Sequence, residues 1–231
     1  MRGHKLKTAA GLRFKRKGTK MLIGFYNYTV VLTYVGLAAS VLGMTQVFGG
    51  HYRAALLCLI ISGTCDMFDG KIARMKKDRT KQEKVFGIQI DSLCDLICFG
   101  MFPATIGYSL THGTERLRML GMAAAVCFVL GAVIRLGYFN VMEQERQEQT
   151  TEHRKYYQGL PVTSVALILP LIYILSQQLS WLPLPQTWCI SMLVISVLFV
   201  SNIRVRKPGS IGTVVMTVLG LAVLAGVLMI C

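Results

Sequence analysis

Two pairs of aspartates stand close together in the sequence, at spacings that fit one face of a helix. Asp66 and Asp69 are three positions apart, and Asp91 and Asp95 are four positions apart. Residues three or four apart are neighbours on a helix surface, so the side chains of each pair would point in one direction. If the two helices lie side by side, they bring four carboxylates into one site.

Four adjacent carboxylates need positive charge between them. One Asp in a transmembrane helix costs about 2.5–3.5 kcal/mol to insert, and unpaired carboxylates repel one another. Divalent cations with oxygen ligands remove both costs, whereas zinc would favour His or Cys. The sequence therefore predicts one or two Mg²⁺ or Mn²⁺ ions, held by Asp66, Asp69, Asp91 and Asp95.

Small residues and an arginine follow the first pair. Gly70 and Ala73 leave room on the helix surface for another helix or for a flat ligand. Arg74 offers a fork of hydrogen-bond donors that suits phosphate. Each feature has an ordinary explanation by itself: an Asp at the end of a span is usually just solvated, and a basic loop usually just sets the membrane orientation. Neither explanation accounts for four Asp around a Gly and an Arg. Together these residues favour a diphosphate substrate at the membrane surface.

The rest of the chain has the composition of a membrane protein. Of its 231 residues 53% are hydrophobic and only 16% are charged, which is too apolar for an ordinary soluble domain. A helix that crosses the bilayer needs about 20 mostly apolar residues. Seven runs qualify: 22–48, 53–75, 86–111, 117–142, 160–179, 186–203 and 210–231. We expect an all-α integral membrane protein, a polytopic bundle of about seven transmembrane helices (six to eight), over residues 21–231.

Lys and Arg gather on one side of this predicted topology. The net charge is +14, eight Lys and Arg precede the first run, and seven lie between Lys71 and Lys84. The positive-inside rule makes both segments cytoplasmic, which puts the N-terminus and the aspartates at the cytoplasmic face. Residues 1–20 are then a basic juxtamembrane segment attracted to anionic headgroups. Nucleic acid is not an expected partner, because no aromatic platform or recognised binding motif accompanies the basic residues.

The two aspartate pairs and their neighbours resemble the signature of the CDP-alcohol phosphotransferase family. That signature is D-x-x-D-G-x-x-A-R followed by G-x-x-x-D-x-x-x-D, and here it runs from Asp66 to Arg74 and from Gly87 to Asp95. Twelve residues, 75–86, separate the halves where about eight are usual, and we assign the excess to a longer charged loop, which costs little closure entropy.

Segments further along the chain resemble phosphatidylserine synthases within that family. They are DSLCDLICFGMFPA (91–104), RLGYFN (135–140) and YYQGLPVTSVA (156–166). Cys98, Tyr138 and Thr163 replace the Ser, Arg and Pro that are usual there. Leu96 follows the last Asp, where phosphatidylglycerophosphate synthases tend to have Lys.

The resemblance implies a metal-dependent transfer of the phosphatidyl group from CDP-diacylglycerol to the hydroxyl of L-serine, with release of CMP. It implies that the cytidine diphosphate lies over Gly70 and Ala73. The residues that would contact CDP-diacylglycerol are Asp66, Gly70, Ala73, Arg74 and Gly87. Asp91 and Asp95 are the expected catalytic residues: Asp91 would hold metal with Asp66 and Asp69, and Asp95 would be a further ligand, the general base, or both.

Arg135 and Asn140 are candidates for binding the acceptor. Arg135 lies inside the predicted fourth span, and an intramembrane Arg is by default a functional candidate. Its guanidinium would suit a serine carboxylate; the alternative is a structural pairing with an Asp or a backbone carbonyl. Asn140 and the turn from Gly159 to Pro161 are expected on the same cytoplasmic rim.

Other interpretations stay open at this point. The same transfer to glycerol phosphate, inositol phosphate or choline would use the same carboxylates. A divalent-cation transporter would also place Asp in membrane spans, although the chain has no evident internal repeat. An inactive scaffold of the same fold would have to keep four intramembrane carboxylates, which are costly, without using them. By family analogy we expect a homodimer, and small size with no obvious organelle signal favours a prokaryotic plasma membrane.

Overall fold

The computed structural model describes residues 24, 28–76, 78, 80–113, 115–149, 156–206 and 210–229. The predicted basic segment 1–20 therefore lies outside the described residues. The side chain of Arg74 lies outside them too, although its backbone belongs to a helix.

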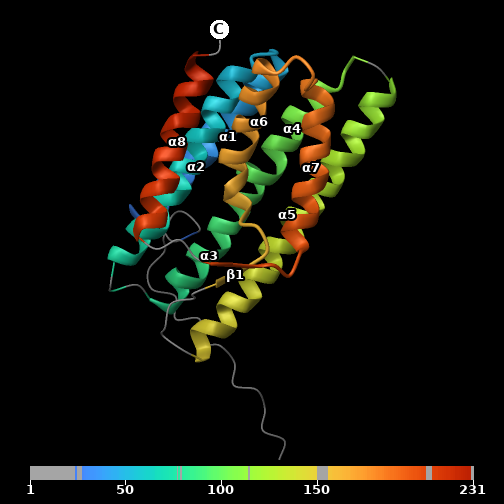
Figure 1. The fold of residues 1–231 in the computed structure, drawn as a ribbon. Coiled ribbons are helices and arrows are strands. Elements are labelled where there is room, and N and C mark those ends of the chain that lie inside the picture. Colours follow the sequence, from blue (N-terminus) through green and yellow to red (C-terminus); the bar gives the residue numbers. More distant parts are fainter. Residues whose placement is uncertain are drawn as a thin grey trace, which may run out of the picture.

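The described chain is mainly helical, and its helices lie side by side in one bundle (Figure 1). The α-helices are α1 (Val31–Phe48), α2 (Tyr52–Met75), α3 (Lys81–Asp95), α4 (Phe102–Leu110), α5 (Glu115–Gln149), α6 (Val165–Gln178), α7 (Leu184–Val200) and α8 (Ser210–Met229). Three short helical turns, η1 (Tyr28–Val30), η2 (Leu96–Met101) and η3 (Val162–Ser164), accompany them. The predicted fold class, a polytopic helical bundle, is confirmed.

Several of these helices are long and apolar enough to cross a membrane. Among the described residues three meet both conditions, Val31–Phe48, Lys81–Leu110 and Glu115–Arg146. Shorter apolar helices cover Val162–Gln178, Leu184–Val200 and Val214–Met229. The predicted second span, α2, has the length, but Arg53, Asp66, Asp69, Lys71 and Arg74 interrupt its apolar residues. α2 carries residues of the predicted site, and this explains its charges without a change of fold.

Two short strands correct the expectation of an all-α chain. β1 (Tyr156–Gln158) and β2 (Arg204–Arg206) pair antiparallel, with Tyr156 opposite Arg206. The pairing continues with a hydrogen bond from Gly159 N to Ile203 O (2.7 Å), and Leu160 N donates to the carbonyl of Leu198 near the end of α7 (3.1 Å). Strands of three residues are too short to give a periodic pattern, which is why the sequence did not predict them. They join the segment after α5 to the end of α7.

The helix that carries Asp91 and Asp95 changes its winding directly after Asp95. There the α-helix gives way to η2, a π-helical segment, before α4 begins at Phe102. Pro103 explains the change, because proline has no N–H and its ring clashes with the carbonyl four residues earlier in a regular helix. π-helical turns inside α-helices are common at functional sites. Here the turn buries Cys98 and Phe99.

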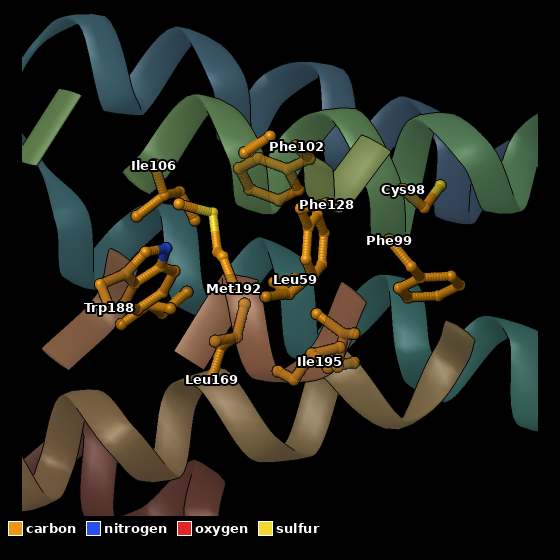
Figure 2. Packing of buried hydrophobic residues seen from close by; sticks show 14 of the residues in the cluster. Leu59, Cys98, Phe99, Phe102, Ile106, Phe128, Leu169, Trp188, Met192 and Ile195 are labelled. Carbon is orange, nitrogen blue, oxygen red and sulfur yellow. The ribbon is translucent and has the colours of Figure 1, made fainter. Parts of the chain in front are cut away.

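The core is formed mainly by residues of α2, α4, α5, α6 and α7. Figure 2 shows Trp188 and Met192 of α7 beside Ile106 and Phe102, and all four side chains are buried. Trp188 Nε1 donates a hydrogen bond to the carbonyl of Pro103 (3.3 Å). This contact fixes the start of α4, and with it the turn that follows Asp95.

α1 and α2 pack closely through small and polar residues. A Cβ on Gly36 would lie 3.2 Å from Cβ of Cys65, so the two backbones approach closely there. Ser40 Oγ and Ser62 Oγ share a hydrogen bond of 2.7 Å, and Ser62 Oγ also donates to the carbonyl of Gly36 (2.6 Å). These buried hydrogen bonds set the register of α2 against α1, one turn before Asp66.

Candidate active site

α2 and α3 bring three of the predicted aspartates together. Asp66, Asp91 and Asp95 each offer a carboxylate oxygen, and these oxygens all lie within 4.8 Å of one another. All three residues are partly buried. Helix periodicity places Asp91 and Asp95 on one face of α3, and that face meets α2. The arrangement is the one expected of a cation held between two helices.

Asp69 is placed differently from the other three. Its side chain is buried, with 6% of the residue exposed, and its carboxylate accepts a hydrogen bond from Thr33 Oγ1 of α1 (2.8 Å). It lines the same cavity as Asp66 and Asp95 but is not part of the group of three. Thr33 therefore holds one carboxylate beside the site while the other three face each other.

The carboxylates border a small cavity between α1, α2 and α3. Its volume is about 10 Å³, near the size of one water molecule. Thr33 and Ser62 contribute hydroxyl groups to its wall, and Cys65, Cys94 and Cys98 contribute thiols. The spacing of these cysteines does not predict their place at the site, because buried Cys is common in helix packing.

The chemistry of these residues fits a hard divalent cation. The three close groups are all carboxylates, which Mg²⁺ and Mn²⁺ prefer, and none of them is the His or Cys that zinc favours. The cavity has the volume for an ion rather than for a large ligand. Asp66, Asp91 and Asp95 would hold such an ion, with Asp69 adjacent.

The turn between α2 and α3 has a defined structure that positions Asp91 and Asp95. Thr80 caps α3: its hydroxyl accepts a hydrogen bond from Glu83 N (3.2 Å), and Glu83 Oε2 accepts one from Thr80 N (2.8 Å). Lys76 Nζ lies 3.4 Å from Glu83 Oε1 and ties the end of α2 to the start of α3. The prediction of a long loop over 75–86 is thus wrong: α3 begins at Lys81, and the extra residues form helix.

The predicted nucleotide surface lies next to the carboxylates. Gly70 is exposed on α2, and a Cβ added to it would meet no atom of the described residues within 4 Å. The described part of the chain therefore leaves open space directly after Asp69. Ala73 and Gly87 are partly buried on α2 and α3. The side chain of Arg74 lies outside the described residues, so its predicted contact with phosphate stays a prediction.

The two candidate acceptor residues both belong to α5. Arg135 is buried, with 7% of the residue exposed, and lies against the turn at Gly159. Asn140 Oδ1 accepts a hydrogen bond of 2.7 Å from Ser92 Oγ of α3. Ser92 stands between Asp91 and Cys94 and was not singled out from the sequence, although its hydroxyl links the carboxylate helix to α5.

The fold and the site define a class of protein: a helical membrane protein with a carboxylate cluster suited to a divalent cation. Residues 26–230 match the model of the CDP-alcohol phosphatidyltransferase family. The chain belongs to this family, in which divalent metals are general.

Characterised relatives carry more specific names. The chain is 29% identical over 168 residues to a CDP-diacylglycerol–serine O-phosphatidyltransferase of Helicobacter pylori, covering 71% of this chain and 66% of that protein. It is 33% identical over 126 residues to the enzyme of the same name from Saccharomyces cerevisiae, covering 53% and 43%. An archaetidylserine synthase of Methanothermobacter thermautotrophicus is 26% identical over 195 residues, covering 84% and 75%. The matches thus span less than two thirds of the H. pylori and yeast proteins.

Proposed function

We propose that this protein transfers the phosphatidyl group of CDP-diacylglycerol to the hydroxyl of L-serine, giving phosphatidylserine and CMP. The observation that carries the proposal is the approach of Asp66, Asp91 and Asp95, whose oxygens lie within 4.8 Å of one another beside the open surface at Gly70. Family membership gives the reaction class, and relatives named for serine transfer support the acceptor.

The reaction is a displacement at phosphorus. The serine oxygen forms a bond to the phosphorus that carries diacylglycerol, the bond from that phosphorus to the bridging oxygen of the diphosphate breaks, and CMP leaves with that oxygen. Divalent ions, when bound, stabilise the negative charge that develops on the diphosphate oxygens. We propose Mg²⁺ or Mn²⁺, and two ions, held by Asp66, Asp69, Asp91 and Asp95.

Asp95 takes the proton of the serine hydroxyl in this proposal. It lies at the end of α3, beside the two other carboxylates of the group and at the start of the π-helical turn. General-base catalysis and correct placement of a weakly acidic hydroxyl both contribute to such a transfer. Asp91 acts as a ligand, because its oxygen lies within 4.8 Å of those of Asp66 on α2 and Asp95 on α3.

The cytidine diphosphate lies over the surface at Gly70 and Ala73, with Asp66 and Gly87 beside it and Arg74 near the diphosphate. A Cβ on Gly70 would meet no described residue within 4 Å, which supports this position, because a flat ligand could approach the backbone there. The acyl chains remain in the bilayer.

The acceptor binds toward α5. Arg135 would pair with the serine carboxylate, and Asn140 would bind the acceptor from a position fixed by Ser92, whose hydroxyl donates to its Oδ1. Glycerol phosphate, inositol phosphate and choline are the alternative acceptors for the same chemistry. A phosphorylated acceptor would require further cationic side chains beside Arg74 and Arg135.

We also propose the membrane placement and assembly. About seven spans, with the N-terminus and the carboxylate site at the cytoplasmic face, satisfy the distribution of Lys and Arg. The membrane would be a prokaryotic plasma membrane, and the assembly a homodimer, by family analogy.

CMP release by the purified protein tests the proposal. The protein in detergent receives CDP-diacylglycerol, Mn²⁺ or Mg²⁺, and a panel of acceptors that begins with L-serine. We expect metal-dependent CMP release that serine stimulates. Release with another alcohol alone would contradict the serine assignment and keep the mechanism. No release under any condition would contradict the enzyme assignment itself.

A further inference from the structure

A second cavity lies at the other end of the bundle from the carboxylates. It has a volume of about 570 Å³ and opens at the turn between α1 and α2, where its wall includes Gln46, His51, Tyr52, Arg53, Leu57 and Tyr173. Arg53 precedes Asp66 by 13 positions on α2. At about 1.5 Å per residue the two lie about 20 Å apart along the helix, so this cavity is separate from the active site.

The wall of this cavity is cationic and rich in hydrogen-bond donors. Arg53 is its charged residue, and no Asp or Glu belongs to the part of the wall that the structure describes. Arg53 Nη2 donates to the carbonyl of Leu228, near the end of α8 (2.9 Å). That hydrogen bond uses one of the five donors of a guanidinium, and it holds the group at the cavity.

The polar part of the wall gives way to an apolar part within one helical turn. Ala54 and Leu57 follow Arg53 on α2, and the ring of Tyr173 comes from α6. Tyr52 is tied to α4 through its hydroxyl, which shares a hydrogen bond of 3.0 Å with Ser109 Oγ. Tyr and Arg at the end of a span are typical of the level of the lipid headgroups. The cavity thus combines a site for an anion with a surface for hydrocarbon.

We propose that this cavity binds the phosphate group of an anionic phospholipid, in the leaflet opposite the active site. Arg53 would bind the phosphate oxygens, Gln46 and His51 would add hydrogen bonds, and the glycerol backbone would lie against Leu57. A free phosphate ion would gain only the polar part of these contacts, whereas a lipid gains both parts. A volume of about 570 Å³ suits a headgroup and not a complete lipid, whose acyl chains would stay in the bilayer.

Lipid binding measured by native mass spectrometry tests the proposal on the full chain. The purified protein is titrated with phosphatidylglycerol, and the fraction that carries lipid is recorded. We expect Arg53→Gln to weaken phosphatidylglycerol binding at least fivefold. Arg118→Gln removes an exposed cation from the first turns of α5 and is not part of the cavity wall, so it is the matched control and should bind as the native chain does.

A second variant separates binding from folding, because Arg53→Gln also loses the contact with Leu228. Gln46→Leu removes a donor from the wall and leaves that contact in place; we expect it to weaken binding about threefold. CMP release should be unchanged in both variants. Equal phosphatidylglycerol binding by the native chain, Arg53→Gln and Gln46→Leu would overturn the proposal. Competition by inorganic phosphate at the concentration of the lipid would overturn the assignment to a lipid.

Discussion

Gly159 lies directly against the guanidinium of Arg135. A Cβ built on Gly159 would stand 3.0 Å from Arg135 Nη1, 2.8 Å from the carbonyl oxygen of Phe199 and 2.9 Å from that of Ser201. The φ angle of Gly159 is +71°, a conformation that residues with a side chain rarely adopt. Position 159 therefore has room for glycine alone, and the turn there closes over the buried Arg135.

Replacing Gly159 with alanine should destabilise the protein. A positive φ and contacts with two backbone carbonyls combine strain and collision, for which we expect a cost of about 1–3 kcal/mol. Thermal unfolding in detergent measures this as a lower midpoint. Gly137→Ala is the matched control on α5, because a Cβ there would meet none of the residues that the structure describes within 4 Å. An unchanged midpoint for Gly159→Ala would contradict the close packing over Arg135.

Replacing Asp91 or Asp95 with asparagine should abolish turnover while the protein still inserts into the membrane. Each change removes a carboxylate from the group of three and leaves the shape of the side chain. We expect CMP release to fall by roughly a hundredfold or more, which is the usual effect of removing a group that stabilises charge in the transition state. Mn²⁺ binding, followed by electron paramagnetic resonance, should weaken in parallel. Asp78→Asn, in the exposed turn between α2 and α3, is the control and should retain both CMP release and Mn²⁺ binding.

Gly70→Ala should separate folding from substrate binding. Where the structure describes the chain, the added methyl group meets no atom within 4 Å, and alanine favours a helix over glycine by about 0.5–1 kcal/mol, so stability should not fall. The same methyl group would stand where we place the cytidine diphosphate. We expect the KM for CDP-diacylglycerol to rise about tenfold, equivalent to about 1.4 kcal/mol. Gly220→Ala on α8, where the added Cβ likewise meets no described atom within 4 Å, should leave KM unchanged.

Arg135→Ala should raise the KM for the acceptor more than the KM for CDP-diacylglycerol. A charge-assisted hydrogen bond is worth about 1.5–3 kcal/mol, which corresponds to about 10- to 150-fold in KM. Steady-state kinetics with each substrate varied in turn measure the two values. An unchanged acceptor KM, together with lower thermal stability, would assign Arg135 to the support of the Gly159 turn instead.

The approach of the carboxylates could be predicted because helix periodicity fixes which residues share a face. The spacing of four positions placed Asp91 and Asp95 on one face of α3, and the structure brings both next to Asp66. The spacing of three positions between Asp66 and Asp69 did not show that Asp69 stands outside this group. Asp69 finds its partner in Thr33, 36 positions earlier, and this contact depends on how α1 packs against α2. Local spacing contains no information about such a pairing.

The structure of the turn between α2 and α3 could be predicted in part from the sequence. Thr80 and Glu83 form the T-x-x-E pattern of a capping box, which marks the first turn of a helix, and α3 does begin there. The hydrophobic run begins later, and it led to an expected start at 86. β1 and β2 left no such signal, because their pairing joins segments that are remote in the sequence and only three residues long.

Ser92→Ala should affect the acceptor through Asn140. Ser92 Oγ donates to Asn140 Oδ1 over 2.7 Å, which holds the amide of Asn140 in one orientation. The NH₂ group of the same amide is a hydrogen-bond donor that could bind a ligand. Loss of the hydroxyl releases the amide, and for one hydrogen bond of about 0.5–1.5 kcal/mol we expect the KM for serine to rise about 2- to 10-fold. Ser92→Thr keeps a hydroxyl and should restore most of the affinity. Equal acceptor KM values in Ser92→Ala and the native chain would show that this hydrogen bond serves packing between α3 and α5, since Asp66, Asp91 and Asp95 remain in both.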